Sequence, residues 1–257
     1  MLAFGRIWNR LYTICITPLK EKIYHYGPIN LKYLFFKKKS EVLVVGFQAC
    51  HKDGARYNYI STLKGFNVNR LYIKDDFAEN HRGNYYLGCN GEYNVEKATM
   101  ALIEAYIKKT NAKKVIFIGS SKGGYAAVNF GISFPGAIMI IAAPQYYLGN
   151  YLNCEYQMPN LRDILGDGFT QKEIEELNVR LKNKILNDMV GKTQKVFIHY
   201  SQNDHTYEDH IKDMLKDLQA VSVSIDCDVR EYTVHGDLKY YYPDYLRKSL
   251  RAVLESD

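Results

Sequence analysis

A serine between two glycines is the first sign of chemistry in this sequence. The stretch VIFIGSSKGGYAAVNFG at 115–131 contains G-x-S-x-G, with Ser121 at its centre, between an apolar run and a segment of helical spacing. This context predicts a sharp strand-to-helix turn that exposes the hydroxyl of Ser121 at a helix N-terminus, where the helix dipole favours an oxyanion. We interpret Ser121 as a nucleophile, although a plain glycine-rich turn or an anion-binding helix N-terminus would use the same residues.

A serine hydroxyl becomes a good nucleophile only beside a general base that a third group orients. Two later loops supply such residues, because Asp204 follows the apolar segment 194–201 and His235 follows the segment 222–234. The chain order Ser, Asp, His is that of the α/β hydrolases. Ser121 would then be the nucleophile, His235 the general base and later the acid, and Asp204 the group that fixes the imidazole tautomer.

Other acids and histidines compete for these roles. Asp209 is a rival of Asp204, and an aspartate in such a loop is also an ordinary turn former. His205 and His210 lie too near Asp204 in the sequence to approach it from a separate loop. His235 is therefore the preferred base.

The tetrahedral intermediate of acyl transfer needs backbone N–H donors for its oxygen. The motif predicts one donor at the N–H of Lys122, the residue after the nucleophile, and a second in the loop after the apolar run 41–47. Phe47 or Gln48 would supply this second N–H. We expect the side chain of Lys122 to reach solvent, and we assign it no chemical role.

Apolar strand-like runs alternate with helical segments along the chain. The alternation predicts an α/β fold with a mostly parallel sheet flanked by helices, and with ligands at the carboxyl ends of the strands. The expected strands are 30–38, 41–47, 66–75, 113–119, 136–144, 194–201 and 222–234, and helices are expected near 57–63, from residue 92, after Ser121 and at the C-terminus.

The polar segment 145–190 falls between two expected strands, where a helical lid or cap would fit. Gln145 and Tyr146 begin this segment, and Tyr86 lies at another predicted loop end, so we assign all three to substrate binding. Tyrosine rings can stack on sugars and bond to their hydroxyls. Ordinary packing is the open alternative for these tyrosines.

The composition of the 257 residues fits one large domain, 1–257, with an N-terminal extension and first strand in 1–40. The net charge of +6 is spread among interleaved acidic residues, so no nucleic-acid partner is predicted. Five scattered cysteines without a C-x-x-C pair favour a cytoplasmic protein and predict neither a disulfide framework nor a metal site. Residues 1–20 have helical spacing, for packing on the domain or for peripheral contact with a membrane or partner.

The segments GSSKGGYAA around Ser121, DDFAENHRGNYYLG at 75–88 and APQYYLGNYL at 143–152 resemble the XcbB/CpsF-type capsular polysaccharide biosynthesis proteins. They are also similar to the glycan acyl-transfer component of the accessory Sec system. The resemblance covers roughly residues 41–250, and the G-S-S-K-G-G motif is its distinctive part. It implies an α/β-hydrolase fold that acts on acyl esters of surface glycans with the nucleophile, acid and base named above.

Four functions from two classes remain open. An acyl esterase or deacetylase needs only the triad, an oxyanion hole and water. An O-acyltransferase forms the same acyl-Ser121 but excludes water and admits a sugar hydroxyl, with a thioester as one choice of donor. A thioesterase would use the same intermediate, whereas a non-catalytic binding or assembly protein would keep the fold without the chemistry. No metal and no tightly bound cofactor is expected.

Overall fold

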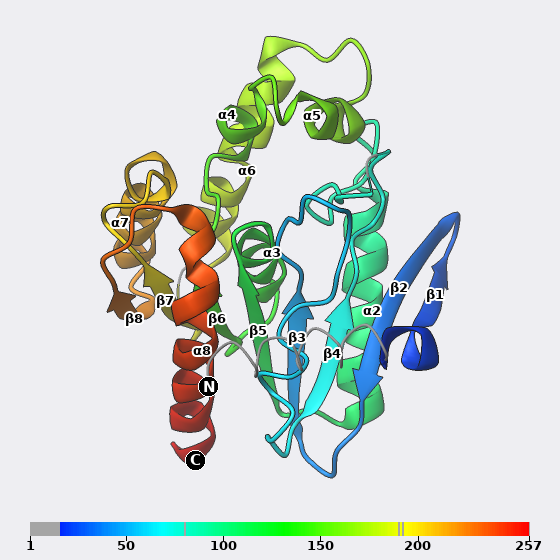
Figure 1. Cartoon of the computed structure of the whole chain (residues 1–257), viewed down its shortest axis with the longest axis vertical. Coiled ribbons are helices and arrows are strands. Elements are labelled where there is room, and N and C mark those ends of the chain that lie inside the picture. Colours follow the sequence, from blue (N-terminus) through cyan, green and yellow to red (C-terminus); the bar gives the residue numbers. More distant parts are fainter. Residues whose placement is uncertain (1–15, 80, 190, 192, 257) are drawn as a thin grey trace.

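An eight-stranded sheet organises the protein in a computed structural model that describes residues 16–79, 81–189, 191 and 193–256 (Figure 1). Its strand order is β1-β2-β4-β3-β5-β6-β7-β8. β2 pairs antiparallel with β1 and β4, and all other neighbours are parallel. The strands are β1 (Lys22–Tyr26), β2 (Ile29–Phe36), β3 (Val42–Phe47), β4 (Asn69–Ile73), β5 (Lys114–Ser120), β6 (Ile138–Ala142), β7 (Lys195–Tyr200) and β8 (Ser224–Val229). The predicted mostly parallel α/β sheet is thus confirmed.

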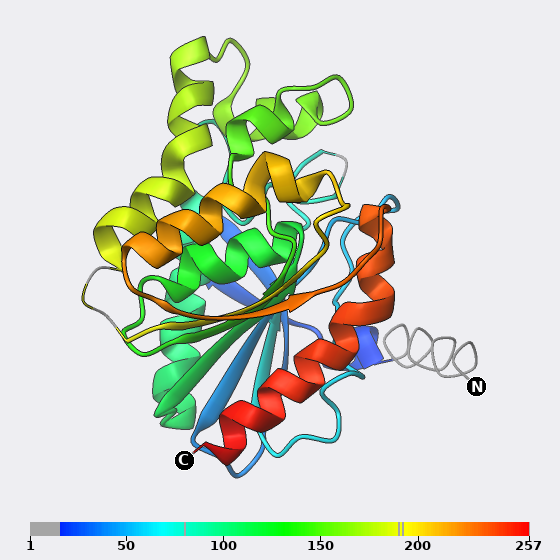
Figure 2. The ribbon, with the colours of Figure 1, turned by 90° about the vertical axis from the view of Figure 1, so that its left-hand side faces the viewer.

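Helices cover both faces of this sheet. The helices are α2 (Asn94–Thr110), α3 (Lys122–Gly131), α7 (Lys212–Ala220) and α8 (Leu238–Glu255). Figure 2 shows α8 across one face and the other three helices on the opposite face. The residues of β4 and β6 are therefore all buried, and the sequence of β6, IMIIA, is a uniformly apolar run rather than an alternating one. The edge strand β8 has a mostly exposed pattern.

One expected helix is absent. Residues 57–63 form turns, and Tyr59 has a φ of +62°, which a right-handed helix does not allow. The hydroxyl of Tyr59 lies 2.5 Å from Ser120 Oγ, and its ring packs edge-on against Tyr242. Contacts with residues far away in the sequence thus override the local helical pattern.

Three extra helices fill the segment between β6 and β7. They are α4 (Leu148–Leu152), α5 (Met158–Leu165) and α6 (Gln171–Asp188). A capping box between Thr170 and Glu173 starts α6, because each residue's side chain bonds the backbone N–H of the other. Figure 1 shows α4, α5 and the upper part of α6 above the sheet, in the position expected of a lid.

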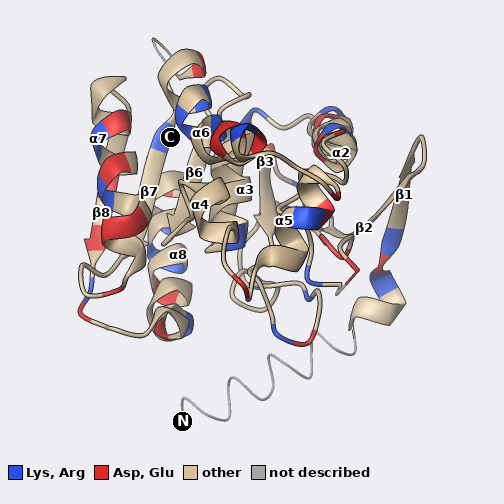
Figure 3. Ribbon diagram, turned by 90° about the horizontal axis from the view of Figure 1, so that it is seen from above, with Lys and Arg blue, Asp and Glu red and all other residues tan. Residues whose placement is uncertain are grey.

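The strand register brings several loops to one edge of the sheet. Ser120 at the end of β5 pairs with Ala142, and Ala142 pairs with His199 near the end of β7. The loops after β5, β6 and β7 therefore leave the sheet side by side beneath the lid helices. Seen from above in Figure 3, ribbon segments coloured for acidic and for basic residues are intermixed around this end of the molecule.

Among the described residues, no helix combines the length and the apolar character needed to cross a membrane. The expected contact of residues 1–20 with a membrane or a partner falls mainly outside the described part of the chain, which begins at residue 16.

Candidate active site

Ser121 stands on a strained turn between β5 and α3. Its backbone has a φ of +52° and a ψ of −120°, a conformation that a residue with a side chain rarely adopts. Its N–H donates to the carbonyl of Ala142 at 2.8 Å, which fixes the turn against β6. A Cβ on Gly119 would lie 2.1 Å from the oxygen of Gly123, so only glycine allows the chain to double back here. The strand, turn and helix expected around Ser121 are all present.

Asp204 and His235 meet although their loops follow different strands. His235 Nδ1 lies 2.8 Å from Asp204 Oδ2, and the carboxylate is completely buried. Burial opposes ionisation of Asp204, but the hydrogen bond and charge of His235 outweigh it and lower the pKa of the carboxyl group. An ionised Asp204 accepts a hydrogen bond from the Nδ1–H group and leaves Nε2 of His235 as a proton acceptor.

The third member of the predicted triad is not hydrogen-bonded to the other two in this structure. Ser121 Oγ accepts a hydrogen bond from Gln145 Nε2 at 3.0 Å. His235 Nε2 is buried and has no hydrogen-bond partner among the described residues. Catalytic hydrogen bonds often tighten only when substrate binds. The Ser121–His235 step of the triad therefore stays a prediction.

A second histidine also contacts the candidate acid. His205 Nδ1 lies 3.0 Å from Asp204 Oδ1, and the ring centroids of His205 and His235 are 5.7 Å apart. From its sequence position His205 was not expected to contact Asp204, but the turn after β7 folds its imidazole back onto this preceding residue. The side chain of His205 is 59% exposed, whereas that of His235 is 25% exposed, so His235 remains the better shielded base.

The predicted oxyanion hole is only partly compatible with the structure. The N–H of Lys122 begins helix α3, as the motif requires. Gln48 cannot be the second donor in this conformation, because its N–H donates to the hydroxyl of Tyr86 at 2.8 Å. Phe47 is the last residue of β3. Its carbonyl oxygen lies 2.8 Å from the position that a Cβ of Gly123 would take, so the end of β3 packs closely against the turn around Ser121. The role of Phe47 as a donor stays a prediction.

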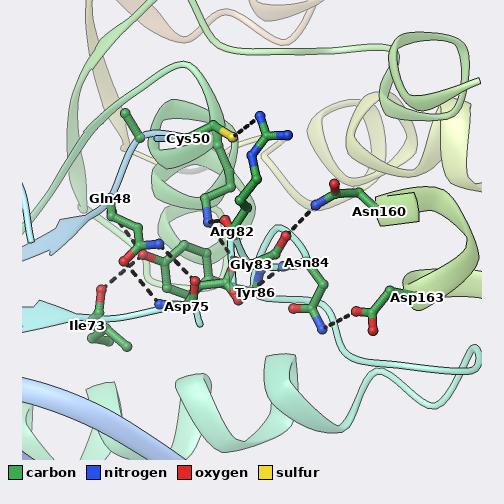
Figure 4. Close-up of polar contacts among 12 residues, drawn as sticks. Gln48, Cys50, Ile73, Asp75, Arg82, Gly83, Asn84, Tyr86, Asn160 and Asp163 are labelled. Carbon is green, nitrogen blue, oxygen red and sulfur yellow. Dashed lines mark hydrogen bonds and ion pairs between the residues drawn. The ribbon is translucent and has the colours of Figure 1, made fainter. Parts of the chain in front are cut away.

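The side chain of Lys122 does not reach solvent, contrary to expectation. Its Nζ is buried, donates to Asp75 Oδ2 at 3.0 Å and to the carbonyl of Arg82 at 2.7 Å. The Asp75 carboxylate also accepts the N–H groups of Asn84 and Tyr86, both at 3.1 Å. Figure 4 shows how these contacts converge on Asp75. Lys122 thereby clamps the segment after β4 to the start of α3.

The lid is attached to the same clamped segment. Asn160 on α5 donates to the carbonyl of Gly83 at 2.7 Å, and Asn84 donates to Asp163 of α5 at 3.2 Å (Figure 4). A Cβ on Gly83 would lie 2.3 Å from both Asp75 Oδ2 and Lys122 Nζ, so a larger residue would break the clamp. The local sequence pattern does not predict this network, because its members come from three separate segments, namely the segment after β4, the start of α3, and α5.

Removal of the Lys122 charge is expected to destabilise the fold. In Lys122→Met the buried carboxylate of Asp75 keeps its backbone donors but loses its counter-ion, which costs about 3–5 kcal/mol. The matched control is Lys172→Met, since Lys172 forms an exposed ion pair with Glu176 at 3.6 Å and its loss costs about 0.5 kcal/mol or less. Urea unfolding of both variants measures the difference, and equal losses would contradict the clamp.

Two of the three residues assigned to substrate binding are structural instead. Tyr86 is fully buried, and its hydroxyl donates to the carbonyl of Ile73 at 2.9 Å. Tyr146 is also fully buried, with its hydroxyl bonded to Asp217 of α7 at 2.7 Å. Neither ring offers a face to a sugar, so these assignments are wrong for this conformation. Gln145 alone reaches the candidate nucleophile.

No cluster of three or more histidine, cysteine, aspartate or glutamate side chains is placed to hold a metal ion within the residues that the structure describes.

A mostly parallel sheet covered on both faces, with a serine on a strained turn between a central strand and a helix, defines the α/β-hydrolase fold. No protein-family model and no curated protein matches the sequence. The solved structures that resemble it include the capsule O-acetyltransferase of Neisseria meningitidis serogroup A, with a TM-score of 0.72 and 20% identity over 89% of this chain and 94% of that one. A mutant of that enzyme in complex with CoA gives a TM-score of 0.71.

Two other solved structures with a similar fold are a glycosylation-associated protein complex and a serine hydrolase. The glycosylation associate protein (Gap123) complex from Streptococcus agalactiae has a TM-score of 0.71 and 19% identity over 93% of this chain but only 46% of that one. FphF, a fluorophosphonate-binding serine hydrolase from Staphylococcus aureus, has a TM-score of 0.63 and 14% identity over 90% of this chain and 96% of that one. The α/β-hydrolase fold implied by the sequence resemblance is confirmed, and a capsule-modifying enzyme and a glycosylation-associated protein are among its structural relatives.

Proposed function

We propose that this protein is a serine O-acyltransferase, which passes an acyl group through acyl-Ser121 to a hydroxyl of a surface or capsular glycan. The observation that carries the proposal is the position of Ser121 on a strained turn, at the same sheet edge as a buried Asp204–His235 pair. The unbonded Nε2 of His235 is the proton acceptor that such a serine needs.

The chemistry has two steps that use the same residues. His235 Nε2 takes the proton of Ser121 as Oγ attacks the acyl carbonyl of the donor, and the proton then passes to the leaving group. In the second step the acceptor hydroxyl gives its proton to His235 and attacks the acyl-Ser121 ester, which regenerates the serine. The N–H of Lys122, at the start of α3, would stabilise the oxyanion of both tetrahedral intermediates.

A thioester such as an acyl-CoA is the donor that we favour. The support is the similar fold of the capsule O-acetyltransferase, of which a mutant binds CoA. Water in place of the glycan hydroxyl would make the protein an esterase or deacetylase, and the serine hydrolase FphF shares the fold as well. Both readings require the same acyl-enzyme, whereas a binding or assembly protein would not form it.

Labelling with a fluorophosphonate probe tests the activated nucleophile. The probe should add one phosphonyl group to the wild-type protein, and peptide mapping should place it on Ser121, because only an activated serine reacts at neutral pH. His235→Ala should abolish or strongly slow the labelling. A folded wild-type protein that stays unlabelled would favour the non-catalytic binding function.

A further inference from the structure

Gln145 is a buried amide with one half of its hydrogen-bonding capacity unused. It lies in the loop between β6 and α4 and is 0% exposed. Its Nε2 donates to Ser121 Oγ at 3.0 Å, whereas its Oε1 is buried and has no hydrogen-bond partner in the part of the chain that the structure describes. Buried polar atoms in native proteins are nearly always paired, so an orphan oxygen calls for an explanation. Its position next to the reacting oxygen provides one.

We propose that Gln145 selects acyl acceptors with two adjacent hydroxyls, the vicinal diol of a sugar. This inference rests on the proposed acyl-Ser121 function. One hydroxyl of the diol would donate to His235 Nε2 and attack the ester, and the neighbouring hydroxyl would donate to Oε1 of Gln145. Both protein acceptors are buried and have no donor among the described residues, and the diol would satisfy them together.

The balance of the deacylation step shows what Gln145 contributes. The attacking oxygen forms its bond to the acyl carbon as its proton passes to His235 Nε2. The bond between the acyl carbon and Ser121 Oγ then breaks, and Oγ takes the proton from His235. Oγ is thereby returned as an acceptor for the N–H of Gln145. Two water molecules would be needed to fill both acceptor positions, whereas a diol fills them as one molecule and loses less entropy.

The preference can be measured on the partition of the acyl-enzyme. The full-length protein is acetylated with p-nitrophenyl acetate in the presence of either 1,2-propanediol or 1-propanol, which differ only in the second hydroxyl. The ratio of ester formed to acetate released is then compared for the two alcohols. Because both products arise after acetyl-Ser121, the ratio does not depend on how fast the serine is acylated.

Wild-type protein should give a ratio about tenfold higher with the diol than with 1-propanol. Gln145→Met, which keeps the volume but removes the oxygen, should bring the two ratios to within about twofold of each other. Gln145→Glu keeps an acceptor oxygen and should keep the preference for the diol. The matched control is Gln194→Met, since Gln194 is another buried glutamine with an unpartnered oxygen, bonded instead to the carbonyls of Ile132 and Phe134.

Several results would overturn the assignment. Equal ratios for the two alcohols in the wild-type protein would do so, and so would a preference that survives in Gln145→Met. If Gln145→Met fails to fold by circular dichroism, Gln145→Asn takes its place with the same expected loss, because the shorter amide withdraws the oxygen from the site. Absence of an acetyl adduct on Ser121 by intact mass would instead overturn the acyl-enzyme itself, and the inference with it.

Discussion

The Ser121→Ala variant is expected to lose acyl transfer and esterase activity by about a million-fold in kcat, because the proposed acyl-enzyme forms on the hydroxyl that this variant lacks. Steady-state hydrolysis of p-nitrophenyl acetate measures the loss, and intact mass after quenching should show no acetyl adduct. The fold should survive, since Oγ makes a hydrogen bond only to Gln145 among the described residues.

Ser120→Ala is the matched control for this variant. Ser120 directly precedes the nucleophile and is almost buried, and its hydroxyl bonds to that of Tyr59 rather than facing Gln145. We expect Ser120→Ala to keep its activity within about tenfold, because the variant loses one neutral hydrogen bond to Tyr59 and no group of the proposed triad. Full activity in Ser121→Ala together with a loss of activity in Ser120→Ala would show that Ser120, and not Ser121, is the nucleophile.

Asp204→Asn is expected to lower kcat by about ten-thousand-fold while leaving substrate affinity nearly unchanged. The carboxylate accepts a hydrogen bond from His235 Nδ1–H at 2.8 Å, whereas an amide in its place would donate to Nδ1 and move the imidazole proton to Nε2. His235 could then no longer take a proton from Ser121. A separate determination of kcat and KM over several substrate concentrations tests this split.

A second histidine–aspartate pair gives the control for this experiment. His199 Nδ1 lies 2.7 Å from Asp228 Oδ2, and the imidazole is stacked with Tyr232 and Tyr241. Asp228→Asn changes the same kind of hydrogen bond outside the proposed catalytic set. We expect it to leave kcat within a few-fold of wild type, and comparable losses in the two variants would show that Asp204 supports the fold rather than the reaction.

The depressed pKa of Asp204 also fixes the direction of one pH effect. A carboxyl group whose pKa is lower in the folded than in the unfolded protein stabilises the fold above its unfolded pKa, and this contribution is lost as the pH falls through the folded value. Asp204 should therefore remain ionised, and keep its hydrogen bond to His235, at pH values where an ordinary aspartate is protonated.

The local parts of this protein could be predicted from the sequence because short-range physics decides them. The turn around Ser121 requires Gly119 and Gly123 for steric reasons, and their spacing is visible in the letters. The central parallel strands β3 and β6 are buried almost throughout, and their sequences, VLVVGF and IMIIA, are uniform apolar runs apart from one glycine. The chain order of Ser121, Asp204 and His235 then followed from the order of the strands, and the structure does join the last two.

The tertiary structure alone decided how the side chains around this framework are used. Lys122 is buried because Asp75, 47 residues earlier in the chain, supplies its counter-ion, and a lysine without such a partner would face solvent. Tyrosine is a residue type that can bind sugars, but the hydroxyls of Tyr86 and Tyr146 form hydrogen bonds inside the protein. A sequence shows which groups a residue can donate or accept, and only the packing of distant segments settles which of these groups remain free for a substrate.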